Sequence, residues 1–143
     1  MKSIRSEIDI HAPVVRVWEL LADLASYPDW NPFIRRAEGT LAQGERLRLE
    51  LQIPDGMRMK IRPRLITVIE QAEIRWIGHL MVPGLFDGNH RFVLTPLAPA
   101  RTRLVQQETF RGALVPVFGG WIGAGARRGF EAMNRAAKAR LEG

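Results

Sequence analysis

Three polar side chains fall on the apolar faces of two adjacent predicted strands, and they are the side chains best suited to acid–base chemistry. His90 shares the apolar face of segment 88–97, and Gln106 and Glu108 share that of segment 102–111. A histidine and a glutamate within reach of each other can act as a proton-transfer pair. They can equally bond each other or a water molecule, or orient a polar group of a ligand. His90 and Glu108 are therefore the candidate catalytic residues, with these other roles open.

A second candidate is the aromatic turn Trp30-Asn31-Pro32-Phe33. Trp30 and Phe33 are suited to line the mouth of a cavity, with Asn31 bonding the backbone of the turn. The alternative is that Trp30 packs in the core and Asn31 only fixes the turn. Trp76 has the same two interpretations, since a tryptophan in a strand is commonly part of the core.

The segment 118–130 is rich in glycine and aromatic residues, which is unusual for a helix. Glycine costs about 1 kcal/mol relative to alanine inside a helix, so several glycines indicate that something approaches this backbone closely. The segment matches neither a phosphate-binding loop nor the Gly-x-Gly-x-x-Gly pattern of dinucleotide sites. Room for a ligand, or close contact between helix and sheet, explains Gly125 and its neighbours better.

Other kinds of chemistry lack the residues they need. The chain has no cysteine, which excludes disulfides and thiolate chemistry. The three histidines, His11, His79 and His90, show no metal-ligand spacing. No serine sits in a Gly-x-Ser-x-Gly turn. The sequence therefore predicts neither a metal nor a cofactor.

The chain of 143 residues carries a formal net charge of +6. Basic residues in segments 45–53 and 57–70 alternate with apolar ones, which places them on one face of each strand. We interpret this face as solvated, and the alternative is a surface that binds anions or an anionic membrane. No specific nucleic-acid partner is expected. The sequence shows no secretory signal and no apolar run long enough to span a membrane, which predicts a cytoplasmic location.

Hydrophobic periodicity predicts one α+β domain over residues 1–143. A strand at 2–11 precedes a helix that begins at Pro13 and a short helical piece at 24–27. Further strands are predicted at 34–38, 45–53, 57–70 (bulged at Pro63), 73–80, 88–97 and 102–111, with a turn at 54–56 and a loop at 81–87. About seven antiparallel strands form one sheet that curls around a long helix at 115–142. The helix is predicted to turn inward the stripe Phe118, Ile122, Gly125, Ala126, Gly129, Phe130, Met133, Ala137 and Leu141.

Two segments give the chain a family resemblance. They are Ala12-Pro13-x-x-x-Val17-Trp18-x-x-Leu21-x-Asp23-x-x-x-Tyr27-Pro28-x-Trp30-Asn31-Pro32-Phe33 and the tail Phe130-Glu131-Ala132-Met133-Asn134-x-Ala136. Together they resemble the START-like, or SRPBCC, superfamily, in particular its polyketide cyclase/dehydrase-like branch. The resemblance covers essentially the whole chain. It implies a helix-grip fold with a cavity between sheet and helix for a lipid, polyketide, isoprenoid or other apolar molecule.

We therefore expect a non-catalytic binder of a small hydrophobic molecule, either monomeric or homodimeric. The expected ligand-binding residues are Trp30, Phe33, Trp76, His90, Phe92, Gln106, Glu108, Phe110, Phe118, Trp121, Ile122 and Gly125. One alternative is a cyclase/dehydratase-type enzyme that uses His90 or Glu108 for proton transfer. Another is a co-chaperone-like or membrane-surface module that uses the basic strands. The binder hypothesis requires a hollow interior, and a filled one would contradict it.

Overall fold

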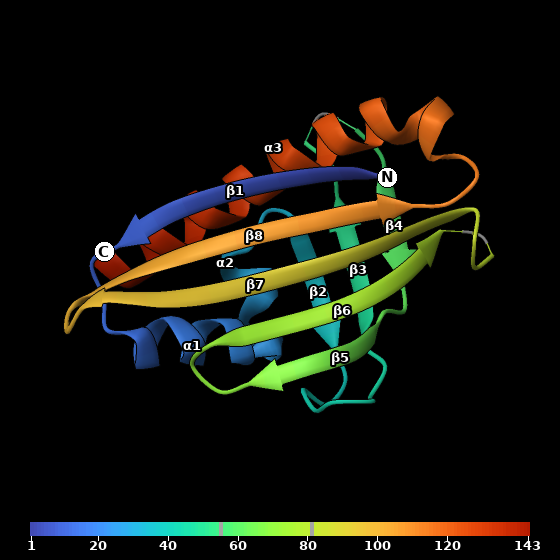
Figure 1. Cartoon of the computed structure of the whole chain (residues 1–143). Helices are drawn as coiled ribbons and strands as arrows, with labels where there is room; N and C mark the ends of the chain where they lie inside the picture. The colour runs from blue at the N-terminus through green and yellow to red at the C-terminus, as the bar shows by residue number, and fades with distance from the viewer. Residues whose placement is uncertain (55, 81) are drawn as a thin grey trace.

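In the part of the chain that the structure describes, eight strands and a long C-terminal helix predominate (Figure 1). The computed structural model describes residues 1–54, 56–80 and 82–143, so Asp55 and Met81 of the predicted turn 54–56 and loop 81–87 lie outside the described residues. The strands are β1 (Lys2–Ile10), β2 (Ile34–Glu38), β3 (Arg48–Gln52), β4 (Arg58–Ile61), β5 (Arg64–Ile69), β6 (Glu73–Leu80), β7 (Phe86–Ala98) and β8 (Arg101–Arg111). The helices are α1 (Val14–Ala22), the 3₁₀ turn Leu24–Ser26, α2 (Tyr27–Trp30) and α3 (Val115–Glu142).

The strands form two antiparallel sheets rather than the single sheet of about seven strands that we predicted from twist and alternation. One sheet has the order β1-β8-β7-β6-β5 and the other has the order β2-β3-β4. The short strands cross the long ones steeply (Figure 1). Near Pro63 the sheets meet, where the Leu47 amide donates to the Pro63 carbonyl at 2.9 Å. The predicted α+β helix-grip class, with a curved antiparallel β-layer and a long C-terminal helix, is confirmed.

The prediction of one bulged strand over 57–70 is wrong. The segment divides at Arg62 and Pro63 into β4 and β5, which belong to different sheets. Proline has no backbone N–H to donate, so a sheet ladder is readily interrupted there. The interruption lets the chain pass from the short sheet to the long one.

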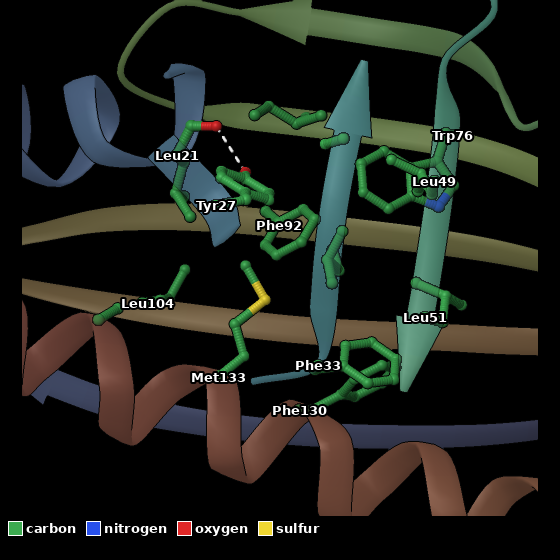
Figure 2. Packing of buried hydrophobic residues seen from close by; sticks show 14 of the residues in the cluster. Leu21, Tyr27, Phe33, Leu49, Leu51, Trp76, Phe92, Leu104, Phe130 and Met133 are labelled. Carbon is green, nitrogen blue, oxygen red and sulfur yellow. Dashed lines mark hydrogen bonds between the residues drawn. The ribbon is translucent and has the colours of Figure 1, made fainter. Parts of the chain in front are cut away.

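Between the sheets lies the hydrophobic core, which α3 closes along one side (Figure 2). Phe33 from the aromatic turn meets Phe130 of α3 edge to face, with ring centroids 5.6 Å apart. Tyr27 is buried and its hydroxyl donates to the Leu21 carbonyl at 2.6 Å (Figure 2). Burial raises the pKa of this hydroxyl well above its usual value. The turn thus contacts α3 through Phe33, and α2 is held to α1 through Tyr27.

The buried stripe of α3 differs from the predicted one at its start. Phe118 is 46% exposed, whereas Gly119 and Gly123 are buried. A Cβ on Gly123 would approach the Lys2 side chain to 2.8 Å, so β1 lies against the helix at that point. The prediction that Phe118 faces inward is therefore wrong, because glycines occupy the face that packs on the sheet.

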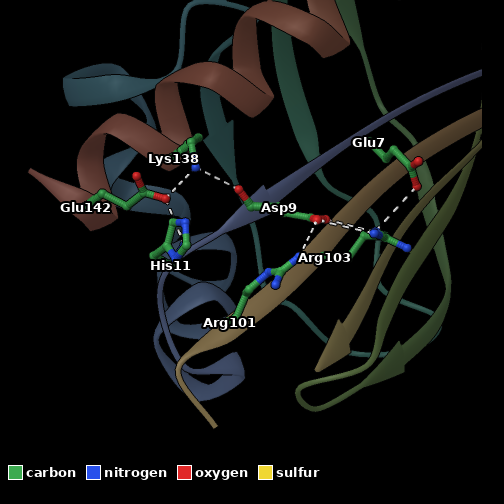
Figure 3. A network of polar contacts seen from close by, with 7 residues as sticks. All are labelled: Glu7, Asp9, His11, Arg101, Arg103, Lys138 and Glu142. Atoms are coloured by element: carbon green, nitrogen blue, oxygen red, sulfur yellow. Dashed lines mark hydrogen bonds and ion pairs between the residues drawn. The ribbon is translucent and has the colours of Figure 1, made fainter. Parts of the chain in front are cut away.

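At its C-terminal end, α3 is tied to β1 by polar contacts (Figure 3). The Lys138 ammonium donates to the Asp9 carbonyl at 2.8 Å and pairs with Glu142 at 2.6 Å. The His11 amide donates to the Glu142 carboxylate at 2.8 Å. This amide and Lys138 hold the pKa of Glu142 below its usual value. These contacts therefore hold the C-terminal end of α3 against the end of β1 and close this end of the interior.

Candidate functional site

An apolar pocket of about 60 Å³ opens at the opposite end of the interior, beneath the N-terminal half of α3. Four parts of the fold supply its walls: β6 to β8, the β3–β4 hairpin, α3, and Phe33 of the aromatic turn. The lining residues are Phe33, Leu51, Ile53, Met59, Ile61, Trp76, Gly78, His79, Leu80, Phe86, Gly88, Glu108, Phe110, Ile122 and Ala126. Aliphatic and aromatic side chains predominate, as is typical of sites for small apolar molecules.

A second hollow of about 110 Å³ adjoins the first across Ile53, Met59 and Ile122, which line both. Its remaining lining residues are Gly56, Met57, Trp121, Gly125 and Arg128. Ligand pockets commonly measure about 300–1,000 Å³, so each hollow alone is small. Methionine fills irregular gaps and moves readily. Displacement of Met59 therefore offers a way to join the two spaces.

Glu108 is the acidic group of the pocket. In the β7–β8 register Glu108 faces His90, and in the β6–β7 register His90 faces Trp76. The His90 ring stacks on Trp76 with centroids 5.1 Å apart and meets the edge of Phe130 at 4.7 Å. The side chain of Glu108 keeps 16% of its surface exposed, whereas that of His90 keeps 3%. Glu108 therefore reaches the pocket and His90 supports it from the core.

Behind the pocket a chain of hydrogen bonds runs through the core. His90 Nδ1 lies 3.3 Å from Glu108 Oε1, and His90 Nε2 lies 3.2 Å from Gln106 Oε1. Gln106 Nε2 donates to Asn134 Oδ1 at 2.7 Å, and Asn134 Nδ2 donates to Ser6 Oγ at 3.2 Å. The sequence placed His90, Gln106 and Glu108 on one face, and the structure brings them into one network. Asn134 was missed because it lies on a different element, far along the chain.

His79 is the other titratable group on the pocket wall. Its Nδ1 lies 2.7 Å from Asp87 Oδ1, and the Gly84 amide also donates to this carboxylate, at 3.1 Å. Burial alone would raise the pKa of Asp87, but the His79 and Gly84 hydrogen bonds outweigh it and leave the pKa lowered. His79 therefore bonds Asp87, and the Gly84 amide bonds the same carboxylate.

The structure places the other predicted ligand residues at three depths. Phe33, Trp76, Phe110 and Ile122 line the inner pocket, and Trp121, Ile122 and Gly125 line the outer hollow. Phe92 joins His90 and Gln106 in the buried core behind the pocket. Trp30 packs edge to face on Tyr27 at 5.3 Å and donates to Ser26 Oγ at 3.1 Å. Phe118 is exposed and lines neither space.

Several pocket residues were not among the sequence candidates. The β3–β4 hairpin supplies Leu51, Ile53, Met59 and Ile61, and β7 supplies Gly88. Alternation with basic residues marked the apolar face of this hairpin. It did not show which wall of the fold that face would meet. The basic side chains of the hairpin, Arg48, Arg58 and Lys60, are exposed, as the alternation predicted.

A family model described as polyketide cyclase / dehydrase and lipid transport matches residues 1–142. The chain belongs to this family. Family membership suggests ligand binding or cyclase activity and does not distinguish the two. A search of curated proteins finds no match.

Solved structures share the fold of this family member. A START superfamily protein from Mycobacterium smegmatis has a TM-score of 0.78 and 23% identity, with 98% of this chain and 97% of that chain covered. The Zhui aromatase/cyclase from Streptomyces sp. R1128 has a TM-score of 0.79 and 22% identity, with coverages of 99% and 93%. BexL, a di-domain ARO/CYC, has a TM-score of 0.78 and 19% identity, and this chain covers 47% of it. At these identities the likeness establishes the fold alone.

Among residues 1–54, 56–80 and 82–143, no three acidic or histidine side chains gather as a metal site would require. Within the same residues, no helix combines the length and the apolar character needed to cross a membrane.

Proposed function

We propose that this protein binds a small hydrophobic molecule, of lipid, polyketide or isoprenoid type, at the open end between the sheets and α3, without transforming it. The observation that carries the proposal is the apolar pocket with few polar groups. Burying apolar ligand surface contributes roughly 25 cal/mol per Å². Such a pocket therefore favours a ligand with an extended apolar body.

The ligand is proposed to occupy both hollows at once. The two hollows share the side chains of Ile53, Met59 and Ile122, which can rotate. A ligand that turns Met59 aside gains the inner pocket of about 60 Å³ and the outer one of about 110 Å³ together. Membership of a family whose description names both polyketide cyclase / dehydrase and lipid transport supports an apolar ligand.

Methionine methyl groups provide a direct test. We expect propylbenzene to shift the NMR signal of the Met59 methyl group, which lines both hollows, and to leave that of Met133, which is fully buried in the core. Native mass spectrometry of the protein purified from its host should show a bound apolar molecule. Equal shifts at both methionines, or no shift at saturating propylbenzene, would contradict binding in this pocket.

A matched pair of variants on α3 sharpens this test. Ala126 lines the inner pocket and Ala124 is exposed on the same helix. Ala126→Leu should fill the pocket and weaken propylbenzene binding at least tenfold. Ala124→Leu should leave the affinity unchanged. Equal affinities of the two variants would place the ligand elsewhere.

A second candidate function is a cyclase/dehydratase-type enzyme. It is favoured by one observation, the contact of 3.3 Å between His90 and a pocket-lining Glu108. In this proposal Glu108 exchanges a proton with the substrate and His90 exchanges it with Glu108. Glu108→Gln should then abolish turnover of a poly-β-keto thioester while the thermal midpoint changes little. Unaltered turnover in this variant would exclude the assigned proton transfer.

A further inference from the structure

The hydrogen-bond network determines whether the pocket-facing oxygen of Glu108 donates or accepts a hydrogen bond. Glu108 Oε1 faces His90 Nδ1 at 3.3 Å, whereas Oε2 lies over Gly88 at the pocket wall. No donor among residues 1–54, 56–80 and 82–143 reaches Oε2. A carboxylate oxygen inside an apolar pocket gains from a hydrogen-bond donor, and a bound ligand is in a position to supply one.

A backbone carbonyl of α3 settles the amide orientation of Gln106. One terminal atom of this side chain lies 3.4 Å from the Phe130 carbonyl oxygen and 2.7 Å from Asn134 Oδ1. Because a carbonyl only accepts hydrogen bonds, that atom is the amide nitrogen. The other terminal atom, Oε1, therefore faces His90 Nε2 at 3.2 Å. It follows that His90 Nε2 carries a hydrogen.

This tautomer determines where the proton between His90 and Glu108 can lie. With Nε2 protonated, the contact between Nδ1 and Oε1 needs one more proton to be a hydrogen bond. Either the imidazole carries it, as an imidazolium beside a carboxylate, or Oε1 carries it and donates to Nδ1. Oε2 bears no hydrogen in either arrangement. It is an acceptor in both.

We propose that the ligand of this protein carries a hydroxyl group, phenolic, enolic or alcoholic, that donates to Glu108 Oε2 while its apolar body fills the pocket. This inference rests on the proposed function, since it specifies the ligand of the same pocket. A ligand without the hydroxyl would strip water from Oε2 and leave an acceptor unpaired, which is costly. Sites built to bond a hydroxyl discriminate strongly against analogues that lack it.

Gly88 provides a second sign that the position of Oε2 is specific. A Cβ added at Gly88 would overlap Glu108 Oε2. Glycine costs stability in a strand and often marks a site where another group approaches closely. Here the missing side chain leaves room for the carboxylate to lie along the pocket wall.

Three probes that differ in one group test the proposal. They are propylbenzene, para-propylphenol and para-propylanisole, which respectively lack the hydroxyl, carry it, and carry it capped by a methyl group. Titration monitored at the Met59 methyl signal measures each affinity. We expect the phenol to bind about tenfold more tightly than the other two, which is the ratio that about 1.4 kcal/mol produces.

Two substitutions at Glu108 separate the hydrogen bond from other effects. In Glu108→Gln the amide nitrogen can donate to His90 Nδ1 and leave an oxygen toward Gly88, so the phenol preference should persist within about threefold. Glu108→Met should remove the preference, because its side chain offers no comparable acceptor. Glu70→Gln, at an exposed carboxylate, is the matched control and should change nothing.

The outcomes distinguish this inference from the proposal on which it rests. Equal affinities of the wild-type protein for all three probes would overturn the hydroxyl requirement and leave the apolar pocket in place. A preference for the ether over the phenol would also overturn it, since Oε2 would then face an acceptor. Failure of all three to bind would overturn the proposed function, and the inference with it. The wild-type comparison stands even if Glu108→Met does not fold.

Discussion

The two ends of the interior are built from the same long strands and the same helix, yet one is filled and the other is hollow. At the filled end α3 presents Phe130 and Met133, both fully buried (Figure 2). At the hollow end it presents Ala126 to the inner pocket and Gly125 to the outer hollow. The difference shows that residue size along one helix face, rather than a change of fold, creates the pocket.

The strands contribute to the same contrast. Gly78 and Gly88 lie on the pocket wall, and the absence of a side chain at Gly88 leaves room for the Glu108 carboxylate. The polar groups differ as well. The filled end buries Gln106 and Asn134 with their hydrogen bonds made, whereas the hollow end turns Glu108 Oε2 to the pocket. His90 joins the two regions, since it bonds Gln106 on one side and Glu108 on the other.

The largest expected difference concerns matched leucines. Leu104 is fully buried at the filled end, whereas Leu80 is half-buried on the pocket wall. Leu104→Ala should lower the free energy of unfolding by about 2–5 kcal/mol, because it leaves a cavity in a packed region. Leu80→Ala should cost less than about 1 kcal/mol, because its surroundings are already open. Urea unfolding of both variants measures the difference, and equal losses would mean that the two ends are packed alike.

Two glycines allow the opposite experiment, in which a methyl group is added at each end. A Cβ at Gly129 would overlap the Phe33 ring, so Gly129→Ala should lower stability by about 1–2 kcal/mol even after the gain in helix propensity. A Cβ at Gly78 would meet Pro63 and Ile61 at 3.7 and 3.8 Å, which are ordinary contacts. Gly78→Ala should therefore stabilise the protein by about 0.4–1 kcal/mol. Thermal unfolding distinguishes these signs, and a loss at both positions would refute the hollow end.

The fastening of the filled end should depend on pH. Hydrogen bonds from Arg103 and Arg101 hold the pKa of Asp9 at about 2, below its usual 3.8 (Figure 3). Because the folded state lowers this pKa, the stabilisation is complete above about 4 and is lost as the pH falls through about 2. Asp9→Asn removes the charge and keeps the backbone carbonyl that Lys138 contacts. We expect a modest stability loss at neutral pH.

A denaturant series from pH 7 to pH 2 on both proteins checks this expectation. The difference between wild type and Asp9→Asn should shrink as the pH falls below about 4. A difference that stays constant over this range would show that the ion pairs with the arginines do not stabilise the filled end. All buffers must have the same ionic strength, because salt screens the interactions between exposed charges.

The sequence predicted the elements better than the way they face each other. Alternation predicted the long strands and helical periodicity predicted α3, because an element that is buried on one face has apolar residues at regular spacing. This pattern is lost where glycine occupies the buried face. Gly119 and Gly123 carry no side chain to signal burial, so the apolar Phe118 was assigned inward instead. The break at Pro63 was seen as a bulge, since a sequence does not show which sheet a strand joins.

The sequence also could not predict which of the candidate residues line the pocket and which are buried behind it. Alternation correctly grouped His90, Gln106 and Glu108 on one face, yet it says nothing of which residue along a strand meets the open end. That depends on where Gly88 and Ala126 leave space, and these residues lie on different elements. The orientation of Gln106 required the Phe130 carbonyl, a backbone group of the helix. Long-range placement therefore decided the chemistry of Glu108.

The smallest effect on stability is expected at Trp121, the aromatic residue at the start of the hollow end. It is 68% exposed, so Trp121→Ala should change the free energy of unfolding by no more than about 0.5 kcal/mol. The residue nevertheless lines the outer hollow, and its loss should weaken propylbenzene binding measurably. Chemical denaturation and the methionine-methyl titration test the two statements separately. A large stability loss would show that the Trp121 side chain is packed rather than exposed, and the contrast between a filled end and an open one would then fail.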